Sequence, residues 1–121
     1  MRYPWPQGSH VRPDHYRRRM ITAGRQGLAI VGGGKIGEAL LAGLVRREGS
    51  GGSGPGEIVV VERSVPRATE LTARYGVAAE DLAGAAGRAR VLLLAVKPQD
   101  IGTLLELLAP HVTADHLVVS V

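Results

Sequence analysis

The sequence predicts an α/β fold in which helices cover both faces of a parallel sheet. Short apolar runs of strand length alternate along the chain with segments whose apolar residues recur at helical spacing. A glycine-rich turn joins the first apolar run directly to the first helical segment. This order of strand, turn and helix favours a doubly wound sheet with right-handed crossovers. The 121 residues suffice for one small domain, since domains commonly hold roughly 100–200 residues.

Apolar runs predict the strands. The longest run, residues 91–96, is expected to form a central strand that is buried on both faces and stopped by Lys97 and Pro98. The last run reaches the end of the sequence, so we expect a sheet that is incomplete at its carboxyl-terminal side. The predicted strands are residues 28–31, 58–61, 77–79, 91–96 and 117–121.

Helical segments are predicted between these strands. The first follows the glycine turn and reaches Val45. The second begins near Pro66, which suits a first helical turn, has Ser64 as its cap and ends near Tyr75. The third and fourth cover residues 81–87 and 100–108.

The positive charge is concentrated near the amino terminus. Residues 1–20 hold five of the 15 basic residues and one of the 11 acidic ones, so the rest of the sequence is formally neutral. Residues 1–27 show no periodicity that would bury a face, which predicts a disordered basic extension before a domain at 28–121. Met20 is a candidate translation start, and a basic arm or a transit peptide are the alternatives. Residues 49–56, rich in glycine and serine, are interpreted as a flexible surface linker.

Composition argues against several classes of protein. No apolar stretch approaches the about 18 residues of a membrane-spanning helix. The absence of cysteine excludes disulfides and thiolate metal ligands, and we expect a cytoplasmic protein without a metal site. Because the body is neutral, we expect no nucleic-acid partner.

The glycine turn carries a G-x-G-x-x-G pattern between a strand and a helix. Gly32 would permit the tight turn, Gly34 would let a pyrophosphate approach the backbone, and Gly37 would let the helix pack closely on the strand. The helix amino terminus would then attract the phosphates. The pattern predicts a Rossmann-type dinucleotide site, and a turn kept only for packing is the alternative.

Residues that follow the second and fourth strands extend this site. Glu62 stands where such folds place a ribose-binding acid, which favours NAD. Arg63 and Ser64 favour NADP, because an arginine beside a hydroxyl can hold a 2′-phosphate. Lys97 and Pro98 would lie at the carboxyl edge of the sheet, where ligands of these folds bind.

The stretch 30–120 resembles the amino-terminal domain of the pyrroline-5-carboxylate reductase family. The resemblance rests on GGGKIGEAL (32–40), ERS (62–64), AVKPQ (95–99) and LVVS (117–120), of which AVKPQ is the most specific. It implies reduction of 1-pyrroline-5-carboxylate to L-proline by hydride transfer from NADPH, with NADH left open by Glu62. The cofactor-binding residues that pattern and resemblance together predict are Val31, Gly32, Gly33, Gly34, Lys35, Ile36, Gly37, Glu62, Arg63, Ser64, Ala95, Val96, Lys97 and Pro98.

This sequence also departs from the family. The family commonly has Asn-Met where Lys35 and Ile36 stand, and often has asparagine near Leu82. Family members continue into a helical domain that binds substrate and builds the dimer. We therefore expect no catalytic residue here, weak dinucleotide binding without turnover, and a homo-oligomer only together with that domain. His111 and His116 are expected to have surface roles.

Two alternatives remain from the sequence. One is another oxidoreductase of the same half-fold, such as a beta-hydroxyacid dehydrogenase or an F420-dependent NADP reductase, against which AVKPQ argues. The other is a non-catalytic NAD(P)-binding module or an inactive gene fragment.

Overall fold

A computed structural model describes residues 27–46 and 57–121. The basic extension predicted at residues 1–27, apart from Gly27, lies outside the described residues, as do Met20 and the predicted linker at 49–56. Gly27 is buried, and its carbonyl oxygen accepts the N–H of Arg90 at 3.0 Å. It therefore belongs to the folded part rather than to the extension. In the described ranges, no helix is long and apolar enough to cross a membrane.

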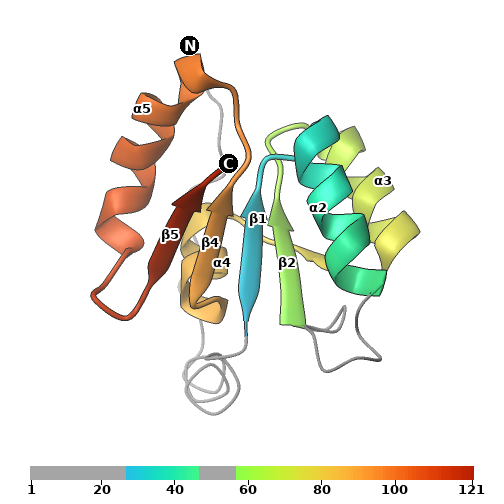
Figure 1. Ribbon diagram of the computed structural model, residues 1–121, viewed down its shortest axis with the longest axis horizontal. Helices are drawn as coiled ribbons and strands as arrows, with labels where there is room; N and C mark the ends of the chain where they lie inside the picture. Colours follow the sequence, from blue (N-terminus) through green and yellow to red (C-terminus); the bar gives the residue numbers. More distant parts are fainter. Residues whose placement is uncertain (1–26, 47–56) are drawn as a thin grey trace.

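Within the described residues, five parallel strands form one sheet in the order β3-β2-β1-β4-β5. Central β1 (Leu28–Val31) pairs with β2 (Ile58–Val61) on one side and with β4 (Val91–Leu94) on the other. β3 (Ala78–Ala79) and β5 (Leu117–Ser120) form the edges. The labelled strands point the same way in Figure 1, so their carboxyl ends share one edge of the sheet. The order reverses between β1 and β4, which is where ligands of such sheets bind.

Helices lie on both faces of the sheet. α2 (Lys35–Arg46) and α3 (Val65–Tyr75) pack on one face, and α4 (Leu82–Arg88) and α5 (Pro98–Leu108) on the other (Figure 1). A 3₁₀ turn, η4 (Ala109–His111), follows α5. The predicted fold class, a doubly wound Rossmann-type α/β sheet, is confirmed.

Two apolar layers hold the helices to the sheet. Successive strand residues point to opposite faces, so Ala29, Val59 and Leu92 pack with α4 and α5, whereas Ile30 and Val60 pack with α2 and α3. The strands β1 and β2 are buried on both sides. Their carboxyl ends are therefore rigidly placed, and the connections that follow them form the candidate site.

The fourth strand differs from its prediction in length and in burial. β4 ends at Leu94 rather than at residue 96, because its partner β1 ends at Val31, opposite Leu94, and Pro98 already begins α5. Proline is favoured in a first helical turn, so the helix begins two residues before the predicted Asp100. Burial on both faces was also wrong: Leu92 and Leu94 are buried, but Val91 and Leu93 are only half-buried. The reason is that α2 and α3 stand over β1 and β2 and leave that face of β4 open.

The other boundaries differ by one residue or less. α3 begins at Val65, and the predicted cap is confirmed because Ser64 Oγ accepts the N–H of Arg67 at 3.4 Å. Asp81 is the N-cap of α4 rather than its first residue, and its carboxylate accepts the N–H of Gly84 at 2.6 Å. β3 lacks Val77, and β5 ends at Ser120.

Candidate functional site

The glycine turn between β1 and α2 is shaped by contacts that leave no room for side chains. Gly32 has φ of 112°, in the left-handed region, and donates its N–H to Val61 O at 2.8 Å. A Cβ at Gly32 would overlap the carbonyl oxygen of Ala95, and a Cβ at Gly37 would overlap that of Gly32. These two glycines therefore hold β1, α2 and the β4–α5 connection in close contact.

Gly34 has a different environment. A Cβ at Gly34 would meet no heavy atom within 4 Å, and the residue is exposed directly before α2. The first N–H groups of a helix have no acceptor within that helix and carry the positive end of its dipole. The open space in front of Gly34 therefore adjoins a feature that attracts phosphate groups.

Glu62 bridges the glycine turn and the β2–α3 connection. Its Oε1 accepts the N–H of Gly33 at 2.7 Å and its Oε2 accepts the N–H of Ser64 at 2.7 Å. Each oxygen of the predicted ribose-binding acid thus already has a backbone donor. This bridge sets the distance between the turn and the connection that carries Arg63.

Arg67, which the sequence analysis did not single out, supports the turn from α3. Its Nε donates to Gly33 O at 2.6 Å, and its two terminal nitrogens pair with Glu38 and Glu70. One signal was available in the sequence, because a cation in a first helical turn opposes the helix dipole unless it has partners.

Glu38 is the centre of an ionic network that joins α2 to α3. Its carboxylate accepts hydrogen bonds from Tyr75, Arg67 and Arg74. The Tyr75 hydroxyl first, and then the two guanidinium groups, lower the pKa of Glu38 to about 2. The same hydrogen bond raises the pKa of Tyr75, because its proton is held by the carboxylate.

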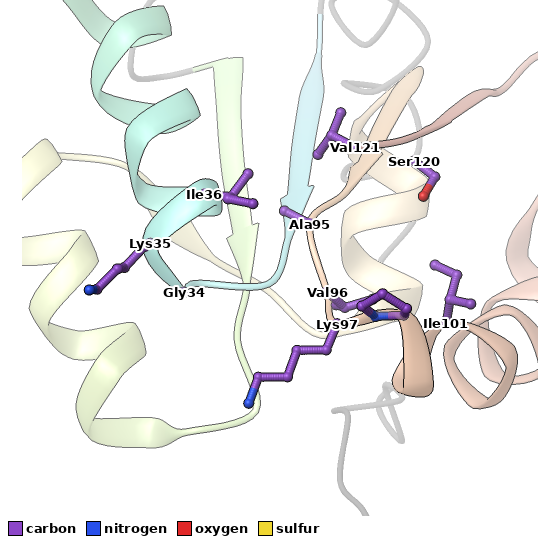
Figure 2. Close-up of a pocket in the computed structure, with 10 residues that line it drawn as sticks. Gly34, Lys35, Ile36, Ala95, Val96, Lys97, Ile101, Ser120 and Val121 are labelled. Carbon is purple, nitrogen blue, oxygen red and sulfur yellow. The ribbon is translucent and has the colours of Figure 1, made fainter.

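Two hollows lie at the carboxyl edge of the sheet, on either side of the glycine turn. The larger, about 660 Å³, extends from α2 to the end of β5, and the smaller, about 190 Å³, extends to the end of β2. Figure 2 shows the larger hollow, with Ile36, Ala95, Ile101 and Val121 around it and the Lys35 side chain extending away from Ala95. Both hollows are lined by Gly34, Ala95, Val96 and Lys97.

The structure brings most of the predicted site residues to these hollows. Val31, Gly37 and Ser64 are the exceptions, since the first two are buried behind the turn and Ser64 caps α3. Val31 and Gly37 could therefore contact a ligand only through their backbone groups. Ser64 is exposed, and its hydroxyl can donate a hydrogen bond while it accepts the N–H of Arg67. The predicted residues in one or both linings are Gly32, Gly33, Gly34, Lys35, Ile36, Glu62, Arg63, Ala95, Val96, Lys97 and Pro98.

The structure also adds residues that sequence reasoning missed. Asp100 and Ile101 enter the linings because α5 begins at Pro98, and Ser120 and Val121 enter because β5 lies beside β4. His111 and His116 line neither hollow. His116 Nδ1 accepts the N–H of Thr113 at 2.9 Å, so Nε2 is the donor to Ala86 O at 2.7 Å. Through these two hydrogen bonds, His116 links the connection before β5 to α4. Among the described residues there is no cluster of three or more metal-ligating side chains.

The family model described as NADP oxidoreductase, coenzyme F420-dependent, matches residues 27–121. The chain belongs to this family. The match includes all of the sheet and both hollows. It shows an oxidoreductase family that uses a nicotinamide cofactor, which agrees with the glycine turn and with the carboxyl-edge hollows.

Named relatives confirm the resemblance found in the sequence. The pyrroline-5-carboxylate reductase of Mycobacterium tuberculosis is 43% identical over 74 residues, which are 61% of this chain and 24% of that protein. The enzymes of the same name from Mycobacterium leprae and Corynebacterium melassecola are 40% and 43% identical over 78 and 75 residues. The chain thus spans about a quarter of the length of these curated relatives.

A solved structure has a fold similar to that of this chain. Synechocystis arogenate dehydrogenase matches with a TM-score of 0.64 and 31% identity, over 78% of this chain and 32% of that one. This protein is named as a dehydrogenase, which is a kind of oxidoreductase, so its name agrees with the description of the family model.

Proposed function

We propose that this chain binds NADP(H) across the two hollows and presents the nicotinamide for the reduction of 1-pyrroline-5-carboxylate. The pyrophosphate would lie on residues 31–37. Arg63 and Ser64 would hold the adenosine 2′-phosphate, and Ala95, Val96, Lys97 and Pro98 would line the nicotinamide ribose. The cofactor would supply the hydride, and these residues bind and orient it.

The open space at Gly34 is the observation that carries the proposal. It lies at the border of the two hollows, because Gly34 lines each of them. A dinucleotide crossing the turn would therefore have room for its two halves on opposite sides, with its phosphates at the start of α2. The larger hollow is lined by Lys35 and Lys97 and by no acidic residue, which agrees with an anionic ligand. In the smaller hollow Arg63 and Lys97 lie beside Glu62 and Asp100.

Two observations support the substrate. The curated relatives carry the name pyrroline-5-carboxylate reductase. Within the family that the model describes, AVKPQ at 95–99 is the motif that favours these reductases over F420-dependent enzymes. Because the chain spans about a quarter of those relatives, substrate and turnover stay proposals. The cytoplasmic location and the absence of a nucleic-acid partner stay predictions from the sequence.

Calorimetric titration of the 121-residue chain with NADPH and NADH tests cofactor binding. We expect tighter binding of NADPH, and we expect Arg63→Ala to weaken NADPH about tenfold or more with little effect on NADH. Arg90→Ala is the matched control, because it removes the same charge from the opposite edge of the sheet, where Arg90 is exposed. An equal loss of NADPH affinity in both variants would mean that binding depends on the net charge of the chain and not on the position of Arg63.

Oxidation of NADPH, followed by its absorbance, tests the reaction. Consumption with pyrroline-5-carboxylate would support the proposed reaction. Exchange of hydride with F420 alone would favour the alternative oxidoreductase. Binding without oxidation in either case is the result expected of these 121 residues alone, and it would show that the chain acts as a cofactor-binding module.

A further inference from the structure

The smaller hollow contains an ion pair between its two walls. Arg63 follows β2, and Asp100 lies in the first turn of α5 after β4. Arg63 Nη2 and Asp100 Oδ2 are 3.5 Å apart. The pair therefore joins the two sides of the hollow in which the adenosine of the cofactor would lie. The inference below rests on the proposed function.

The other carboxylate in this hollow, Glu62, has a separate task. Its two oxygens accept the N–H groups of Gly33 and Ser64, so it holds the backbone of both connections. Asp100 instead directs its carboxylate to the guanidinium group that would bind a 2′-phosphate. Phosphate and Asp100 would thus compete for one cation.

The ion pair between Arg63 and Asp100 is weak enough for an anionic ligand to replace Asp100 as the partner of Arg63. Its distance exceeds that of a close charge-assisted hydrogen bond, and the side chains of Arg63 and Asp100 are 46% and 29% exposed. Partly exposed ion pairs contribute little to stability, so opening this one costs little. Asp100 lies in the first turn of α5, where an acidic residue is favoured by the helix dipole.

We propose that Asp100 is a determinant of cofactor specificity that lowers the preference for NADP(H) over NAD(H). It does so in two ways: it occupies Arg63 in the free protein, and it repels the 2′-phosphate in the complex. NAD(H), which has a hydroxyl at this position, meets neither effect. The sequence conflict between Glu62 and the Arg63–Ser64 pair is then decided by a residue 37 positions after Arg63.

Two adenosine ligands isolate the effect. Adenosine 2′,5′-bisphosphate carries the 2′-phosphate and adenosine 5′-monophosphate lacks it, so the ratio of their affinities for the 121-residue chain measures discrimination. We expect Asp100→Asn to raise this ratio about fivefold at low salt and less at high salt. Glu106→Gln removes the same charge from an exposed position on the same helix and should leave the ratio unchanged.

A double-mutant cycle tests the route through Arg63. Arg63→Ala should lower the ratio, and Asp100→Asn should no longer raise it by the same factor in that background. Circular dichroism verifies that each variant is folded. Should Asp100→Asn unfold, Asp100→Ser, which removes the same charge, makes the same test.

The outcomes separate this inference from the proposed function. Binding of both ligands with an unchanged ratio in Asp100→Asn would overturn the role of Asp100 and leave the dinucleotide site standing. An equal rise in the Glu106→Gln control would also overturn it, because long-range charge would then explain the effect. Binding of neither ligand by the unaltered chain would overturn the proposed function, and this inference with it.

Discussion

Gly34 and Gly37 belong to one motif, but the structure gives them separable tasks. A methyl group at Gly37 would overlap the carbonyl oxygen of Gly32, so the absence of a side chain there lets α2 approach β1 closely. Gly34 touches nothing that a methyl group would displace. The motif therefore combines a packing requirement with an access requirement, and a substitution at each position distinguishes the two.

We predict that Gly37→Ala destabilises the fold by about 3 kcal/mol, because its methyl group meets backbone that cannot move without disrupting the turn. Gly34→Ala should change the free energy of unfolding by less than about 0.5 kcal/mol and weaken NADPH binding about tenfold, since its methyl group would stand where the phosphates approach. Chemical denaturation and calorimetry measure the two effects. Equal stability losses would contradict the open space at Gly34.

For single residues, the sequence predicted which ones lie near the candidate site but not which atoms they contact. Most of the predicted set lines the hollows because parallel strands bring their carboxyl ends to one edge. The hydrogen bonds of Glu62 to Gly33 and Ser64 and the support from Arg67 depend on distances between connections that no local pattern encodes. The Arg63–Asp100 pair was missed for the same reason.

Between elements, the network around Glu38 joins α2 to α3 by charge where the two helices meet. Arg67 belongs to this network and to the glycine turn at once, since it pairs with Glu38 and donates to Gly33 O. The packing of the two helices is therefore coupled to the backbone that would hold the phosphates.

The order of strands and helices could be predicted from periodicity. The predicted ends of elements were wrong by one or two residues where a proline or a capping residue sets the boundary, as at Pro98 and Asp81.

The lowered pKa of Glu38 predicts a stability change in acid. Because its folded pKa is about 2, below its ordinary value, its contribution is fully present above about pH 5 and is lost as the pH falls toward 2. Melting temperatures of the unaltered chain and of Glu38→Gln should differ at neutral pH and converge near pH 2. Glu106→Gln is the control. A difference that does not change with pH would show that the ionised form of Glu38 is not what matters.

Across the whole molecule, the two faces of the sheet are covered unequally. α4 and α5 bury one face across β1, β2 and β4, whereas α2 and α3 leave β4 and β5 partly open on the other. Leu117 is 59% exposed on β5, although it belongs to a run of apolar residues typical of a buried strand. Sequence periodicity predicted this strand correctly. It could not predict how far the strand is buried, because burial depends on where the helices lie.

This asymmetry predicts that the same substitution, leucine to threonine, has unequal costs on two adjacent strands. Leu92 is fully buried on the α4–α5 side of β4, so Leu92→Thr removes apolar contacts and buries a hydroxyl, at a cost of about 3 kcal/mol in the free energy of unfolding. Leu117 pairs with Val91, the neighbour of Leu92, and points to the opposite face. Leu117→Thr should therefore cost less than about 0.5 kcal/mol, because threonine suits an exposed strand position. Denaturant unfolding of both variants measures the difference, and comparable losses would mean that the open face is buried in solution.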